Sequence, residues 1–144
     1  MLASHDRTIK IWDLAKGYCI KTILTLSSCN DVCLVEQDGN LIVTGHLDNG
    51  IRIWYSHYNN GNKPNLPRDT RSGSMVSEIV GRHCGQITNV IHISQKNAVL
   101  TTSRDDTIKL VDLRMDQKEL LCYKADGFRT AFNWSKSCVS PDFK

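Results

Sequence analysis

The sequence has no long hydrophobic run and no concentrated positive charge. No apolar stretch approaches the ~20 residues that a membrane-spanning helix needs, and residues 1–6 lack the basic and apolar regions of a signal peptide. The formal net charge is only +3, because 18 Lys and Arg stand against 15 Asp and Glu, spread along the chain. A clustered basic face is typical of nucleic-acid binding, so we expect no direct contact with nucleic acid. We expect a cytoplasmic protein without a transmembrane segment.

The chain also lacks a clear catalytic or metal-binding constellation. His83 beside Cys84, or Cys29 with Cys33, are the only combinations that suggest a nucleophile pair or a metal site. A structural zinc site usually has four ligands in paired clusters, and one loose cysteine pair does not meet that requirement. We therefore expect no enzyme activity, no metal and no cofactor. The six cysteines lie mostly in apolar segments such as residues 18–20, which indicates free buried thiols.

What the sequence does contain is one short pattern in three copies. Residues 4–14 (SHDRTIKIWDL) join a polar turn to a strand in which Ile9 and Ile11 share one face. The same pattern returns at residues 48–54 and 105–113. Three copies indicate a repeat protein.

Short strands joined by tight turns account for most of the chain. Alternating apolar residues between turn-forming residues predict strands at 8–12, 17–24, 30–35, 41–45, 51–54, 76–80, 86–93, 97–102, 107–111, 119–123 and 137–140. Tight turns are expected at 38–40 and 141–142. The strands group into units of about four, at residues 1–24 (incomplete), 25–55, 75–114 and 115–144 (the start of a further unit). The pattern predicts an all-β protein.

An extra segment separates the second and third copies. Asp6 and Asp48, the aspartates of the first two turns, are 42 residues apart, but Asp48 and Asp105 are 57 apart. The additional residues fall within 56–74, which is rich in Asn, Gly, Ser and Pro. We expect a disordered surface loop. The alternative is a segment for phosphorylation or partner binding, because residues 68–72 place hydroxyl groups beside basic side chains.

The period of roughly 40 residues, the four strands per unit and the Trp-Asp pair at Trp12 resemble the WD40 β-propeller family. The resemblance implies a buried polar network in each blade, built from a His, a Ser or Thr, an Asp and a Trp. Its implied members are Asp6 and Trp12 in the first copy, Thr44, Asp48 and Trp54 in the second, and His83, Thr101 and Asp105 in the third. Leu2, Leu26 and Val111 stand at positions where a network residue is missing. No copy is complete, so we expect these blades to depend more on apolar packing than on the network.

A narrower resemblance is to the C-terminal propeller of the autophagy-related protein 16 family. It rests on residues 4–14, 19–22, 27–31, 44–48, 103–106 and 133–142, among which Cys29-Asn30 and Asn133-Trp134-Ser135 are not needed by ordinary WD40 blades. The resemblance implies a non-catalytic interaction scaffold in autophagosome assembly. It would act with the ubiquitin-like conjugation machinery or cargo receptors and be recruited indirectly to the forming membrane. The alternative is a generic WD40 scaffold of an unrelated complex.

Residues beside the turn aspartates are the candidates for partner binding. In a propeller these turns share one rim, so we expect His5, Arg7, Arg104 and Asp106 to project from the same face. The alternative is that each is a solvated turn residue paired with its neighbours.

The strands amount to about three blades, whereas closed propellers of the family that the chain resembles usually have about seven, and small rings have at least four. We therefore expect residues 1–144 to form a partial, open WD40 propeller with two exposed sheet faces.

Overall fold

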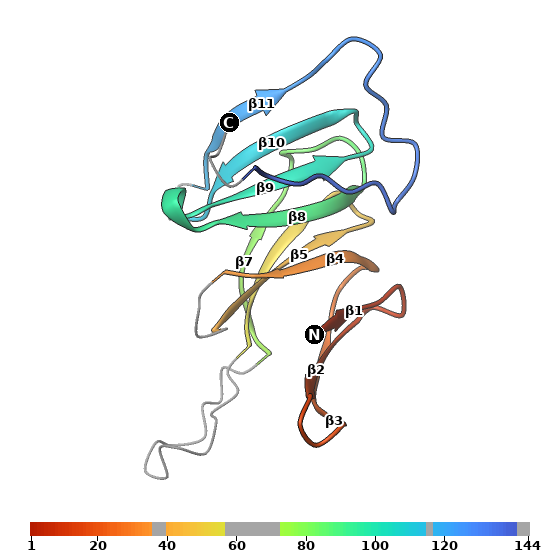
Figure 1. Ribbon diagram of the computed structural model, residues 1–144, viewed down its shortest axis with the longest axis vertical. Coiled ribbons are helices and arrows are strands. Elements are labelled where there is room, and N and C mark those ends of the chain that lie inside the picture. The colour runs from red at the N-terminus through yellow and green to blue at the C-terminus, as the bar shows by residue number, and fades with distance from the viewer. Residues whose placement is uncertain (36–39, 57–72, 115–116, 141–144) are drawn as a thin grey trace.

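The protein is described by a computed structural model, which covers residues 1–35, 40–56, 73–114 and 117–140 and consists almost entirely of β-strands (Figure 1). The first strands are β1 (Leu2–Ala3), β2 (Thr8–Asp13), β3 (Tyr18–Leu24), β4 (Cys29–Leu34), β5 (Leu41–His46) and β6 (Ile51–Tyr55). They are followed by β7 (Met75–Ile79), β8 (Ile87–Ile93), the short 3-10 helix η1 (Ser94–Lys96), β9 (Ala98–Ser103), β10 (Thr107–Asp112) and β11 (Glu119–Tyr123). The predicted all-β class is confirmed.

The strands form three antiparallel sheets, which follow one another from the bottom to the top of Figure 1. The first sheet has the order β1-β2-β3, the second β4-β5-β6-β7 and the third β8-β9-β10-β11. The three sheets do not close into a ring, so the prediction of an open partial propeller is confirmed. The second and third sheets are offset from the sequence units, because β7 of the unit at 75–114 pairs with β6, and β11 of the unit at 115–144 pairs with β10.

The same turn chemistry precedes β2, β6 and β10. In each turn an aspartate Oδ1 accepts a hydrogen bond from the backbone N–H two residues later, at 3.0, 3.2 and 3.1 Å for Asp6, Asp48 and Asp105. The residue after each aspartate has a positive φ of 64°, 66° and 60° (Arg7, Asn49 and Asp106). Aspartate stabilises such a turn through its own side chain, which explains why it recurs at this position.

Apolar side chains fill the spaces between successive sheets. Ile9 and Ile23 of the first sheet pack against Ile42 and Trp54 of the second. A larger cluster joins the second sheet to the third and includes Val43, Ile51, Ile53, Val90, Val99 and Val111. Burying these side chains is the main stabilising contribution to the stack.

Two predictions need correction, and three others lie wholly or partly outside the described residues. Residues 137–140 do not form a strand, because a strand needs a hydrogen-bonded neighbour and no described segment pairs with them. The six cysteines are free, as expected, but of these only Cys29 is buried, whereas Cys84, Cys122 and Cys138 are exposed. Cys122 is exposed because β11 is an outer strand with little cover. Residues 57–72 of the expected loop, 38–39 of the expected hairpin turn and the turn at 141–142 lie outside the described residues.

Candidate protein-interaction surface

In the third sheet, His83 is held between a turn and a strand. Its Nδ1 lies 2.9 Å from Asp105 Oδ2, and its Nε2 lies 2.9 Å from Thr101 Oγ1. Asp105 also accepts hydrogen bonds from Cys84 N at 2.9 Å and from Thr107 Oγ1 at 2.6 Å. The three residues implied for this copy are therefore in direct contact, although Val111 stands where the tryptophan would be. The contacts hold the segment before β8 against the turn between β9 and β10.

In the second sheet, a residue that sequence reasoning missed takes the place of the absent histidine. Leu26, at the position where the family often has the histidine, is 66% exposed, whereas His46 is fully buried. Its Nε2 lies 2.7 Å from Thr44 Oγ1, its Nδ1 lies 3.1 Å from Ser27 O, and Trp54 Nε1 donates to Thr44 Oγ1 at 2.8 Å. The available signal was the spacing, because side chains two residues apart on a strand share a face.

Asp48 does not join this group, contrary to the implied network. It forms a two-pronged ion pair with Arg52, at 3.0 Å (Nη1 to Oδ1) and 2.6 Å (Nη2 to Oδ2). Arg52 also contacts Glu78 Oε1 at 2.5 Å. The guanidinium draws the carboxylate to itself because a bidentate charged pair is stronger than a neutral hydrogen bond.

Burial sets the protonation of the two histidines. Desolvation lowers the pKa of His46, and it lowers the pKa of His83 despite the nearby Asp105 carboxylate. Burial alone would raise the pKa of Asp105, but hydrogen bonds from Thr107, the Cys84 amide and His83 lower it to about 2. Near pH 7 both histidines are therefore neutral and the Asp105 carboxylate is ionised, which suits a structural role.

The first sheet has no comparable buried group. Asp6 accepts hydrogen bonds from Thr8 N and Thr8 Oγ1 within its own turn. Trp12 is 41% exposed, and Leu2, at the Ser or Thr position, is exposed as well. Alternation along β2 places Trp12 on the face opposite Ile9 and Ile11, away from the second sheet.

The four candidate partner-binding residues lie in two turns on the same side of the molecule, the right side in Figure 1. His5, Arg7 and Arg104 are exposed, and Arg104 Nη1 makes a long contact of 3.4 Å to Gln86 Oε1. Asp106 is half-buried and differs from the others, because its Oδ1 accepts a hydrogen bond from Thr130 N at 2.7 Å. The two arginines are thus the most available charged groups of the four.

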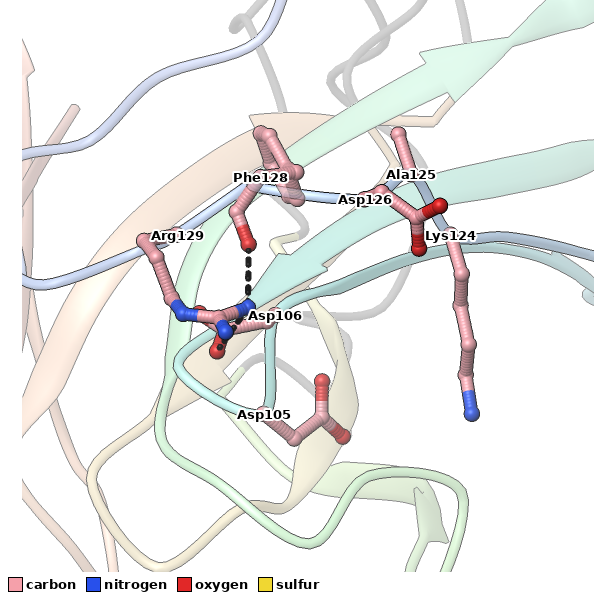
Figure 2. Close-up of a pocket in the computed structure, with 7 residues that line it drawn as sticks. All are labelled: Asp105, Asp106, Lys124, Ala125, Asp126, Phe128 and Arg129. Carbon is pink, nitrogen blue, oxygen red and sulfur yellow. Dashed lines mark hydrogen bonds and ion pairs between the residues drawn. The ribbon is translucent and has the colours of Figure 1, made fainter.

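A pocket of about 450 Å³ adjoins Asp106 and is shown in Figure 2. It is lined by Asp105, Asp106, Lys124, Ala125, Asp126, Phe128 and Arg129. Arg129 Nη1 donates to Phe128 O at 3.0 Å and lies 3.6 Å from Asp106 Oδ2. Sequence reasoning found Asp106 but not the residues that follow β11, since no motif marks them.

The described residues contain no group of three or more His, Cys, Asp or Glu side chains that could hold a metal ion. No helix among them is long and apolar enough to span a membrane.

Comparison with known proteins supports the WD40 propeller fold. The WD domain, G-beta repeat model matches residues 17–55. The crystal structure of the WD40 beta propeller domain of Doa1 superimposes with a TM-score of 0.68 at 20% identity, covering 88% of this chain and 36% of that one. The chain therefore contains a WD repeat and has the fold of a partial WD40 β-propeller. Such propellers are generally non-catalytic scaffolds that mediate protein–protein interaction.

Two relatives of this WD40 chain match almost its whole length. Autophagy-related protein 16 of Arabidopsis thaliana is 39% identical over 142 residues, which is 97% of this chain and 24% of the relative. Protein tipD of Dictyostelium discoideum is 37% identical over 140 residues, which is 96% of this chain and 20% of the relative. The chain thus spans about a quarter or less of these proteins, and the resemblance to autophagy-related protein 16 predicted from the sequence is confirmed.

Proposed function

We propose that this WD40 chain is the docking part of an autophagy-related protein 16-like factor that acts in autophagosome assembly. The observation that carries the proposal is the similarity to Autophagy-related protein 16 over 97% of the chain. Its partners are proteins of the ubiquitin-like conjugation machinery or cargo receptors. It works in the cytoplasm and reaches the forming autophagosome membrane through them.

The partner-binding rim comprises His5, Arg7, Arg104 and Asp106. The exposed Arg7 and Arg104 supply positive charge that protein partners can pair with, while Asp106 holds the backbone of Thr130 in place. Charged residues at the rim of an interface chiefly steer association and select the partner. The rim therefore recognises a protein surface with complementary acidic groups.

The test is capture of autophagy proteins by the tagged chain and its Arg7→Glu and Arg104→Ala variants. We expect each variant to lose about 1 kcal/mol of binding free energy, or roughly fivefold in Kd, because an exposed charge pair contributes no more than that. Arg114→Ala is the matched control, since Arg114 is also an exposed arginine, 71% accessible, but lies after β10 at the opposite end of that strand. Equal capture of autophagy proteins by all variants would contradict the proposed partner-binding rim. Capture only of an unrelated complex would support the generic WD40 scaffold instead.

A further inference from the structure

The residue that follows the turn aspartate carries opposite charges in the first and third sheets. This residue is Arg7 before β2, Asn49 before β6 and Asp106 before β10, and all three have a positive φ. They therefore occupy the same place in the three turns. The first turn has an arginine at this place, whereas the third turn has an aspartate.

The side chain of Asp106 is already used within the chain. In the first turn, the linker that follows β3 is bound through the backbone, because Thr25 N donates to Arg7 O at 2.8 Å. In the third turn, the linker that follows β11 is bound through the carboxylate, because Thr130 N donates to Asp106 Oδ1 at 2.7 Å. The Arg7 side chain thus remains exposed, whereas Asp106 is half-buried.

The linker after β11 brings an arginine to the third turn. Phe128 N donates to Ala125 O at 3.1 Å, and Gly127 between them has a positive φ of 77°, so residues 125–128 form a turn of their own. The next residue, Arg129, lies beside Asp106, with 3.6 Å between Nη1 and Asp106 Oδ2, and its Nη1 donates to Phe128 O at 3.0 Å (Figure 2). Both contacts are made by Nη1. They orient the guanidinium so that the edge formed by Nε and Nη2 can bind a further carboxylate through two hydrogen bonds.

The charged side chains around the third turn lie at different depths. The side chain of Asp105 is 15% exposed and that of Asp106 is 34% exposed, whereas that of Arg129 is 72% exposed. Arg104, in the same turn as the two aspartates, is exposed as well. A protein that approaches this turn therefore meets two arginines before it meets the two aspartates.

We propose that Arg129, rather than Asp106, completes the partner-binding rim at the third turn. Together with Arg104 it binds carboxylates of an acidic segment on the surface of a partner protein. This inference rests on the proposed function, since it concerns the same rim. The other exposed charges of the linker, Lys124 and Asp126, have opposite signs and offset each other. Arginine suits this task because it keeps its charge at any physiological pH and binds a carboxylate through two parallel hydrogen bonds.

The test measures the Kd of a fluorescein-labelled hexaglutamate peptide by fluorescence anisotropy, with labelled hexalysine as the probe of opposite charge. The unaltered chain should bind hexaglutamate more tightly than hexalysine. Arg129→Gln and Arg104→Gln should each raise the Kd for hexaglutamate roughly fivefold, and the double variant roughly 25-fold, because the two side chains bind different carboxylates. Arg114→Gln is the matched control and should leave the Kd unchanged. Arg114 is 71% exposed with its Nε 3.9 Å from Asp112 Oδ1, but it lies at the opposite end of β10.

Ionic strength and circular dichroism separate the effect of charge from an effect on folding. At about 1 M NaCl, where the Debye length is about 3 Å, the differences between the variants should become small. Circular dichroism verifies that each variant keeps its strands, as we expect for changes to exposed side chains. A loss of binding in Arg129→Gln that persists at high salt would show that Arg129 acts through packing, and would overturn the inference.

The charge of the preferred peptide and the effect of Arg129→Gln decide the inference. Tighter binding of hexalysine would show that the aspartates of this region meet the partner, and would overturn it. Absence of hexaglutamate binding, or the same Kd for Arg129→Gln as for Arg114→Gln, would overturn it as well.

Capture of autophagy proteins by the tagged chain distinguishes this failure from failure of the proposed function. A chain that captures these proteins equally well with and without Arg129→Gln keeps the proposed function and loses this inference. A chain that binds hexaglutamate through Arg129 but captures none of these proteins loses the proposed function and keeps the recognition of carboxylates.

Discussion

At the residue scale, the second and third sheets each contain one buried histidine that joins nearby polar groups. The two histidines come from different positions within their sequence units. His83 reaches Asp105 and Thr101 from before β8, whereas His46 lies within β5, two residues after Thr44. In both sheets the imidazole meets a threonine hydroxyl that faces the preceding sheet. The position of the threonine hydroxyl, rather than the place of the histidine in the sequence, therefore determines where the buried polar group forms.

Both histidines make stability depend on pH. Burial lowers the pKa of His46 and of His83 from the ordinary 6.5, so the unfolded chain binds protons that the folded chain does not. The free energy of unfolding should therefore fall as pH drops below 6.5, by up to about 1.4 kcal/mol per pH unit for each histidine. Urea unfolding at pH 7, 6 and 5 measures it, and His46→Gln should reduce the slope. A free energy of unfolding that is constant or rises between pH 7 and pH 5 contradicts this prediction.

At the element scale, the strand positions followed closely from local chemistry. The Asp turns predicted where β2, β6 and β10 begin, because each aspartate holds the backbone two residues ahead. Residues 137–140 have the same alternation but form no strand, since pairing depends on a neighbour that local sequence does not specify. The pairing of Asp48 with Arg52 instead of a histidine was equally hidden, because it depends on where the Arg52 side chain lies, between Asp48 and Glu78 of the neighbouring strand β7.

The approach of β5 to β8 depends on Gly45. A Cβ at this position would overlap Ile87 Cγ2 and lie 3.2 Å from Val90 Cγ1. We expect Gly45→Ala to destabilise the fold by about 3 kcal/mol through overpacking, measured by thermal or urea unfolding. Gly127→Ala is the control: it meets no atom within 4 Å, and its positive φ of 77° costs only about 1 kcal/mol.

A double variant identifies the cause of that loss. Ile87→Ala removes the side chain that the new methyl group would meet, so Gly45→Ala with Ile87→Ala should cost less than the sum of the two single changes. Additive costs would show that Gly45 matters for a reason other than contact with Ile87.

At the scale of the whole molecule, each sheet is most buried in its middle strands and least buried at its outer edge. All but one residue of β5 and of β9 are buried, whereas most of β3 and all of β11 are partly or fully exposed. The number of sheets could be predicted by counting repeats in the sequence. The direction of this gradient could not, because it depends on which strand of each unit faces the neighbouring sheet.

The gradient predicts the order in which backbone amides exchange with solvent. Amides of β5 and β9 are hydrogen-bonded between two strands and open only when a sheet unfolds, whereas those of β3 and β11 have a partner on one side. We expect exchange in β3 and β11 to be faster by roughly two orders of magnitude, because outer strands open locally at low free energy. Hydrogen–deuterium exchange followed by mass spectrometry resolves these segments. Equal protection of β9 and β11 would mean that the third sheet opens only as one unit, and that its outer strand is held by contacts beyond its pairing with β10.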